Sequence, residues 1–217
     1  MEAQEQSNID SLQVRSYELP DIVVAAGRTP VEAQQAARLV SIITRTEIER
    51  APAQSLNDLL RFTSAVDVRQ RGPLGAQADI SIRGGTFDQT LILLNGINIT
   101  DPQTGHNNLN LPVDIESIEK IEILQGPAAK SFGPNAFNGA INIITGNSKP
   151  DHIRVSGMAG QHSLNKESVN ISNTIGPFKH FLSLSRMSSE GYIHNTNHYN
   201  QPAHYNLTQT QLETEKQ

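Results

Sequence analysis

Cysteine is absent from the 217-residue chain, and aromatic residues make up only 5% of it. The lack of cysteine excludes disulfide bonds and thiolate metal sites, which suits a protein of the cell envelope but also a cytosolic one. With 36% hydrophobic residues, the chain can form a hydrophobic core, although a lean one. Its length predicts one or two domains.

Long apolar runs and excess positive charge are also missing. No stretch approaches the ~18 consecutive apolar residues that indicate a transmembrane helix. The net charge of −5 gives no reason to expect nucleic acid as a partner, because domains that bind it usually carry a basic patch. The opening residues, MEAQEQSNID, lack the basic and apolar regions of a signal peptide, which taken alone argues against export.

Residue patterns that carry chemistry are missing as well. The sequence shows no row of carboxylates, no nucleophile beside a base and no metal-ligand spacing. His194, His198 and His204 lie close in sequence, but the polar residues and Pro202 among them disfavour the helix that would bring two of them together. We therefore predict no catalytic residues, no metal and no cofactor, and an enzyme is only a distant alternative.

Strands, tight turns and glycines dominate residues 80–145. Two apolar runs, Leu91–Leu94 and Ile97–Ile99, flank Asn95-Gly96, which is a strong signal for a β-hairpin. Two further predicted strands, Ile118–Leu124 and Ala140–Thr145, bracket a loop rich in Gly, Pro and Asn.

The preceding segment contains short predicted helices and strands. A strand is expected at Leu39–Ile43, and Thr46–Glu49 has a capping-box pattern that predicts a brief helix ending near Pro52. Ser55 opens a second predicted helix, with Leu56, Leu59 and Leu60 on its core face, and Val66–Val68 is a further strand.

The pattern changes after Gly146. Ile153–Gly160, Lys166–Ile175 and Phe181–Ser188 are extended runs with partial period-two alternation, which is typical of transmembrane β-strands that are apolar outside and polar inside. Residues 192–217 are expected to form a loop and one more strand.

Several motifs in the central block carry a resemblance. They are Ile82–Gly85 (IRGG), Leu91–Gly96 (LILLNG), Ile121–Pro127 (IEILQGP), Phe132-Gly133 and Gly139–Thr145 (GAINIIT). In this order, they resemble the plug domain of TonB-dependent outer-membrane transporters. The resemblance implies an α+β plug with a small mixed sheet and short helices, followed by the first antiparallel strands of a transmembrane β-barrel, in the outer membrane.

The resemblance also implies a division of the chain. It predicts a flexible segment at 1–20, a TonB-box-like segment and linker at 21–37, the plug at 38–146 and a partial barrel at 147–217. A barrel of about 22 strands with about 9–11 residues each needs about 220 residues, so residues 147–217 suffice for three or four strands. A signal peptide would be expected ahead of residue 2.

One short β-prone run matches the segment by which the family recruits the energy-coupling protein TonB. Its residues are Asp21, Ile22, Val23, Val24, Ala25 and Ala26. An extended segment can add itself to the edge of a partner's sheet through main-chain hydrogen bonds. The alternative is an ordinary first strand of the plug.

Two polar loops, residues 70–78 and 101–110, are the expected ligand contacts, because outward-facing plug loops touch the ligand in this family. The predicted contact residues are Gln70, Arg71, Gln77, Gln103, Thr104, His106, Asn107 and Asn108. The motif GGTFDQTL with DPQTGH is most similar to the cobalamin-receptor branch. The alternatives are a ferric-siderophore receptor, solvated turns without a ligand, and a soluble binding or adaptor module. An extracellular lipoprotein partner is also compatible with the family.

Three charged residues in the block, Arg83, Glu119 and Glu122, are predicted to contact the barrel wall, because charged plug residues pair with it in the resembling family. The alternative is a solvated strand face, since period-two alternation already explains their polarity. Gln125 stands where the family often has a basic residue, which weakens a complete ionic lock.

Overall fold

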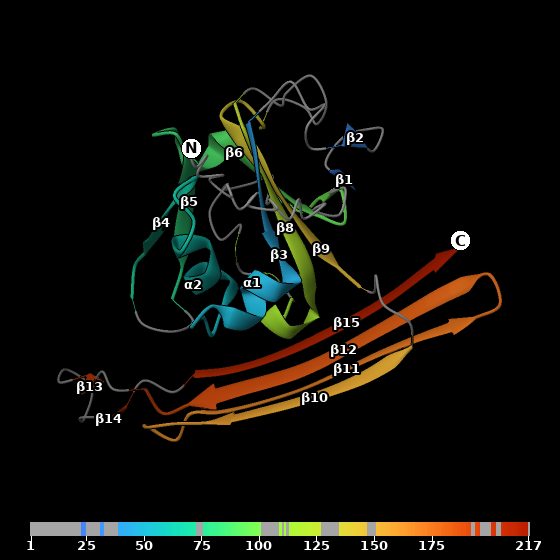
Figure 1. Cartoon of the computed structure of the whole chain (residues 1–217). Helices are drawn as coiled ribbons and strands as arrows, with labels where there is room; N and C mark the ends of the chain where they lie inside the picture. The colour runs from blue at the N-terminus through green and yellow to red at the C-terminus, as the bar shows by residue number, and fades with distance from the viewer. Residues whose placement is uncertain are drawn as a thin grey trace, which may run out of the picture.

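The computed structural model describes residues 23–24, 31–32, 39–72, 76–100, 109, 111, 113–126, 135–146, 151–191, 194–195, 201–202 and 205–216. Two layers make up most of this part of the chain (Figure 1). The first, which we call the α+β unit, comprises the elements from β3 to β9 within residues 39–146. The second, the long-strand sheet, comprises β10, β11, β12 and β15.

A five-stranded mixed sheet forms the centre of the α+β unit, in the order β3-β8-β9-β6-β7. Its strands are β3 (Leu39–Thr44), β6 (Thr90–Leu94), β7 (Ile97–Asn98), β8 (Ile118–Gln125) and β9 (Gly139–Thr145). β6 and β9 pair in parallel, and the other pairs are antiparallel. The small mixed sheet expected from the resemblance is thus confirmed.

The β6–β7 hairpin turns at Asn95 and Gly96, whose φ angles are 51° and 79°. Two consecutive positive φ angles define the tight turn whose twist matches that of paired strands, and Asn-Gly is its preferred sequence. The predicted hairpin is therefore confirmed, with strand bounds that differ by one residue at each outer end.

The main hydrophobic core lies on one face of this sheet. The isoleucines of the central strands pack in one cluster with residues of the helices and of the β4–β5 hairpin. Those that are fully buried include Ile92, Ile121, Ile123, Ile141 and Ile143. The hairpin consists of β4 (Val66–Gln70) and β5 (Ala78–Ile82). A smaller cluster on the opposite side of the sheet contains Leu91, Leu93, Ala136 and Ala140.

Two six-residue helices, α1 (Arg45–Arg50) and α2 (Leu56–Arg61), follow β3. α2 begins after Ser55, whose side chain accepts from the Asp58 amide, and it buries Leu56, Leu59 and Leu60 as predicted. α1 starts earlier than predicted.

The capping box of α1 is formed by Thr44 and Glu47 and not by Thr46 and Glu49. Thr44 is the last residue of β3, and its amide donates to Glu47 Oε2 at 2.7 Å. Glu49 is occupied elsewhere, because its Oε1 accepts from Arg45 Nε at 2.9 Å. Thr44 and Thr46 are each followed by a glutamate three residues later, as a capping box requires. Thr44 forms the box because β3 ends at this residue and the helix begins at the next one.

Short elements complete the described chain. β1 (Val23–Val24) pairs with β2 (Val31–Glu32), within the stretch expected to hold the TonB-box-like segment and a linker. Two single 3-10 turns, η2 (Phe87–Gln89) and η3 (Ile115–Ser117), precede β6 and β8. β13 (His194–Asn195) and β14 (Gln201–Pro202) form a separate two-residue pair.

The long-strand sheet is antiparallel, in the order β10-β11-β12-β15. Its strands are β10 (His152–Ala159), β11 (Asn165–Ile175), β12 (Phe178–Ser189) and β15 (Tyr205–Lys216). The three predicted runs and the additional strand after them are all present, with shifted bounds.

The two faces of the long-strand sheet differ in polarity. Apolar side chains such as Ile153, Val155 and Leu212 are more than 70% exposed on one face. The other face carries buried polar residues, namely Lys166, Ser168, Asn170, Ser172, Ser183 and Ser185. The predicted alternation, apolar outside and polar inside, is confirmed.

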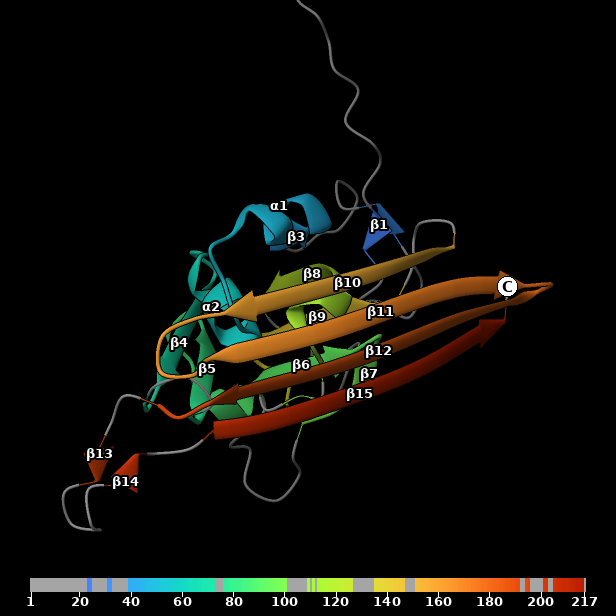
Figure 2. The same cartoon turned by 90° about the horizontal axis from the view of Figure 1, so that it is seen from below.

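Figure 1 shows the long-strand sheet running beneath the α+β unit, with α1 and α2 on the side nearest the sheet, and Figure 2 shows the four strands crossing in front of it. The polar face is the one turned toward the α+β unit, because its residues hydrogen-bond to it. Among the described residues, no helix is both long and apolar enough to cross a membrane.

Gly139 provides a test of the packing in the central sheet. A Cβ atom at this position would lie 2.4 Å from the Leu124 carbonyl oxygen and 2.8 Å from Ile82 Cδ1. Because backbone cannot move aside cheaply, we expect Gly139→Ala to lower the free energy of unfolding by about 1–3 kcal/mol in denaturant titrations. Gly157→Ala is the matched control, since its nearest neighbour would be 4.0 Å away. Equal losses for the two variants would contradict this packing.

Candidate functional site

A buried ion pair joins the two layers. Lys166 Nζ of β11 lies 2.6 Å from Asp114 Oδ1, and the two side chains are 7% and 4% exposed. Asp114 is the residue before η3, but its side chain makes no capping hydrogen bond there. The carboxylate is therefore directed to the long-strand sheet and not to its own backbone.

Two arginines extend this contact around η3. Buried Arg45 donates to the carbonyl oxygens of Ile115 and Ile118, both at 3.0 Å, and pairs with Glu116 Oε2 at 2.7 Å. From the opposite layer, Arg154 of β10 donates to the Glu116 carbonyl oxygen at 3.3 Å. The turn η3 is thus held from both the α+β unit and the long-strand sheet.

A third set of contacts centres on Glu213 of β15. Its Oε1 accepts hydrogen bonds from Asn95 Nδ2 at 2.6 Å, from Thr145 Oγ1 at 2.5 Å and from Gln211 Nε2. The Gln211 amide also donates to Thr145 Oγ1 at 2.7 Å. One carboxylate oxygen therefore connects the β6–β7 turn, the end of β9 and the long-strand sheet.

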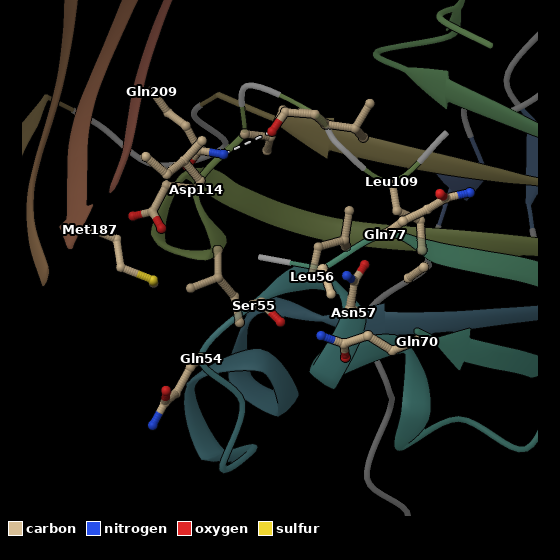
Figure 3. Close-up of a pocket in the computed structure, with 16 residues that line it drawn as sticks. Gln54, Ser55, Leu56, Asn57, Gln70, Gln77, Leu109, Asp114, Met187 and Gln209 are labelled. Carbon is tan, nitrogen blue, oxygen red and sulfur yellow. Dashed lines mark hydrogen bonds between the residues drawn. The ribbon is translucent and has the colours of Figure 1, made fainter. Parts of the chain in front are cut away.

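Between these layers lies a pocket of about 290 Å³ (Figure 3). Residues of α2, the β4–β5 hairpin, the segment before η3 and strands β12 and β15 line it. Gln70 and Gln77, two of the predicted ligand contacts, are among them. Leu109 and Leu111, at the end of the second predicted ligand loop, also line it. The pocket therefore brings the flanks of both loops together.

Arg71, the third described residue of the predicted ligand set, points to a neighbour within the hairpin. Its Nη2 and Nε lie 2.7 Å and 3.1 Å from Asp79 Oδ2, and Gln77 Nε2 donates to Asp79 Oδ1 at 3.2 Å. Asp79, which the sequence patterns did not single out, thus fixes Arg71 and Gln77 on either side of the loop.

The remaining predicted contacts with ligand and with TonB are mostly not described. Gln103, Thr104, His106, Asn107 and Asn108 lie outside the described residues, as do Asp21, Ile22, Ala25 and Ala26. Val23 and Val24 form β1. The assignment of these residues to ligand and TonB binding stays a prediction.

The three charged residues predicted to contact a barrel wall have different surroundings. Arg83 is exposed, adopts a φ of 54° in the turn after β5, and lies next to Gly126. Glu119 is half-buried at a register shift between β8 and β9. Their assignment to the barrel wall stays a prediction.

Glu122 is 0% exposed, so it does not lie on a solvated strand face. Its Oε1 pairs with Lys120 Nζ at 2.8 Å, and its Oε2 accepts from Asn142 Nδ2 at 3.2 Å. These partners belong to β8 and β9, so Glu122 is satisfied within the central sheet. Whether it also contacts a wall stays a prediction.

The residues that connect the layers were missed by the sequence patterns. They are Asp114, Arg154, Lys166, Gln209, Gln211 and Glu213. A usable signal was present, since Lys166, Ser168, Asn170 and Ser172 occupy every second position of one strand. That period marks a polar face, although it does not identify the partner of each residue.

The contacts described above are hydrogen bonds and ion pairs between the two layers. In the part of the chain that the structure describes, no group of three or more His, Cys, Asp or Glu side chains is placed to hold a metal ion. An α+β unit hydrogen-bonded to the polar face of an antiparallel sheet, with polar loops beside it, has the form of a receptor's plug domain against its wall.

Comparison with known protein families also indicates a receptor plug domain. The sequence model of the TonB-dependent receptor plug domain matches residues 32–140, half of the chain. The chain therefore belongs to the TonB-dependent receptor plug-domain family.

Among curated relatives are two vitamin B12 transporters named BtuB. The protein from Vibrio vulnificus is 32% identical over 153 residues, which cover 70% of this chain and 25% of the relative. The protein from Vibrio cholerae serotype O1 is 36% identical over 124 residues, which cover 57% of this chain and 20% of the relative. The chain thus spans about a quarter of the length of these relatives or less.

Solved structures with the same fold include siderophore receptors. The ferric yersiniabactin uptake receptor FyuA from Yersinia pestis has a TM-score of 0.67 at 17% identity, over 82% of this chain and 29% of that one. The siderophore receptor PirA from Acinetobacter baumannii has a TM-score of 0.56 at 26% identity, over 76% of this chain and 27% of that one. The α+β fold with adjoining antiparallel strands is thereby confirmed.

The buried ion pair is expected to hold the layers together. Asp114→Asn leaves the Lys166 ammonium buried without its counter-charge, so we expect the free energy of unfolding to fall by about 3–5 kcal/mol. Asp67→Asn is the matched control, because the Asp67–Arg69 pair is exposed on both sides and such pairs contribute about 1 kcal/mol or less. Denaturant titrations measure both.

A double variant makes this test specific to the pair. Adding Lys166→Met to Asp114→Asn removes the uncompensated charge, so part of the lost stability should return. Additive losses in the double variant would show that the two side chains do not stabilise each other.

Proposed function

We propose that this chain supplies the plug and adjoining wall strands of a transporter in the outer membrane that takes up a cobalamin. In this proposal the plug spans residues 38–146 and occludes the lumen, and residues 147–217 belong to the wall. Residues 21–37 contain the TonB-binding segment and a linker, and the predicted N-terminal segment at 1–20 lies outside the described residues. The role is binding and energised transport, without catalysis.

The proposal is supported by the combination of two findings: what the relatives transport, and how the two layers of the structure are arranged. Two relatives at 32% and 36% identity are vitamin B12 transporters, and the matched region includes the unit whose loop flanks meet at the pocket. The polar face of the long-strand sheet receives the α+β unit, while its apolar face is exposed. Such a polarity suits strands with lipid on one side and a plug on the other.

Ligand contact and TonB binding are coupled in this proposal. A ligand at loops 70–78 and 101–110 would favour the state in which residues 21–26 are released to TonB, because a ligand shifts an equilibrium toward the state that it binds more tightly. TonB would then pair with the released segment by strand addition. A ferric-siderophore receptor is the second candidate, favoured by the siderophore receptors that share the fold.

The nutrient can be tested by calorimetric titration of the full chain in detergent micelles. We expect saturable heat with cyanocobalamin and none with ferric yersiniabactin. Gln77→Ala should weaken cyanocobalamin binding about 2- to 10-fold, the equivalent of one hydrogen bond of about 0.5–1.5 kcal/mol. Gln161→Ala, in the exposed β10–β11 turn, serves as the control. Heat with ferric yersiniabactin alone would favour the second candidate.

TonB coupling can be tested with a proline substitution. Val23→Pro removes a main-chain donor from the segment, so binding of a TonB C-terminal domain to the full chain should weaken about tenfold or more. Val14→Pro makes the same change outside residues 21–26 and should leave the affinity unchanged. If both variants bound like the parent chain, the assignment of residues 21–26 would have to be given up.

A further inference from the structure

The direction of the Asp114 carboxylate depends on the turn that Asp114 begins. The Asp114 carbonyl oxygen accepts from the Ser117 amide at 2.9 Å and from Ser117 Oγ at 2.6 Å, so its main chain closes η3. Its carboxylate makes no capping bond in this turn and reaches Lys166 Nζ at 2.6 Å. A change in the shape of η3 would therefore redirect the carboxylate that contacts the long-strand sheet.

The ion pair of Asp114 and Lys166 is incompletely hydrogen-bonded. Asp114 Oδ2 is buried and accepts no hydrogen bond from the residues that the structure describes. The attraction within a buried pair offsets the loss of hydration only when its geometry is good and further hydrogen bonds satisfy the remaining lone pairs. Because one carboxylate oxygen is unsatisfied, this pair depends on surrounding structure to keep its two members aligned.

Arg45 holds the turn in shape. Its Nη1 donates to the carbonyl oxygens of Ile115, Glu116 and Ile118 at 3.0, 3.3 and 3.0 Å, and its Nη2 pairs with Glu116 Oε2 at 2.7 Å. Carbonyl oxygens at the end of a helical turn have no partner within it. A planar guanidinium with five donors can fix several such oxygens relative to one another. We call these contacts the Arg45 clasp.

The charges around the clasp are balanced within the α+β unit. Arg45 Nε donates to Glu49 Oε1 at 2.9 Å, so the guanidinium faces two glutamates, Glu49 and Glu116. Arg154 of β10 approaches the same two residues, with its Nη2 3.5 Å from Glu49 Oε1 and its Nη1 3.3 Å from the Glu116 carbonyl oxygen. If the layers separated, both glutamates would keep Arg45, whereas the members of the buried ion pair would lose each other. The electrostatic cost of separation is thus concentrated in that pair.

We propose that Arg45 is a positioning residue whose clasp on η3 keeps the two layers attached. With the clasp closed, η3 directs Asp114 to Lys166. With the clasp open, the turn relaxes and the ion pair separates, although neither of its members has changed. Arg45 is the first residue of α1 and directly follows β3, so the attachment depends on the position of this junction. The role is conformational and requires neither a particular nutrient nor TonB.

The test is the acetylation rate of individual lysines in the full chain in detergent micelles, measured by mass spectrometry of its peptides. A buried, ion-paired lysine reacts only when it is transiently exposed, so its rate reports how often the layers separate. Arg45→Lys keeps the charge but removes the planar fork, and should raise the rate of Lys166 about tenfold or more. Arg50→Lys makes the same change at an exposed position of the same helix, and should leave that rate unchanged.

A second lysine distinguishes opening of the clasp from general loss of structure. Lys120 of β8 pairs with buried Glu122 inside the central sheet, and its rate in Arg45→Lys should change by less than about twofold. Asp114→Asn removes the counter-charge directly and should also raise the rate of Lys166. Adding Arg45→Lys to Asp114→Asn should cause no further rise, because both changes act on one contact.

Four results would overturn the proposal. An unchanged rate of Lys166 in Arg45→Lys or in Asp114→Asn would show that the clasp or the ion pair does not hold the layers. An equal rise for Lys120 would mean that Arg45 only stabilises the α+β unit as a whole. An equal rise of Lys166 in Arg50→Lys would remove the special role of the clasp. Increases that multiply in the double variant would show that Arg45 and Asp114 act independently.

Discussion

The arrangement of the two layers depends on the pairing of Asp114 with Lys166 across their interface. Removing two charges from water is costly, and the cost is offset only when both groups meet at short distance. Here the distance is 2.6 Å and both side chains are almost fully buried. An apolar interface could slide, whereas this pair is satisfied in one register only. The contacts of Arg154 and Glu213 on neighbouring strands agree with the same register.

The same carboxylate links the interface to the pocket. Asp114 Oδ1 pairs with Lys166, and Asp114 is also one of the residues that line the pocket. Asp114 therefore belongs both to the lining of the pocket and to the contact between the layers.

The β6–β7 turn illustrates how a local feature acquires a second role. Asn95 adopts positive φ because the hairpin requires it. Its side chain accepts from the Thr145 amide at 2.9 Å and donates to Glu213 at 2.6 Å. The turn residue therefore ties the end of β9 and the long-strand sheet together, so that the hairpin tip is anchored at both layers.

Much of the secondary structure follows from local rules that need no tertiary information. The Asn95-Gly96 hairpin, the leucine face of α2 and the period-two strands after Gly146 were predictable because turn chemistry and side-chain direction depend on neighbours in sequence. The family motifs between residues 82 and 145 were sufficient to identify the plug domain. Predicted ligand residues Gln70 and Gln77 do line a common pocket.

Other features were decided only when distant segments packed. Thr44 and Thr46 both fit a capping box, and the end of β3 selected Thr44. Glu122 fits a solvated strand by alternation, yet Lys120 and Asn142 satisfy it in a fully buried position. Asp114 and Lys166 are 52 positions apart in sequence (166 − 114). Period and propensity state which face a residue occupies, but the partner that compensates a buried charge is set by three-dimensional proximity alone.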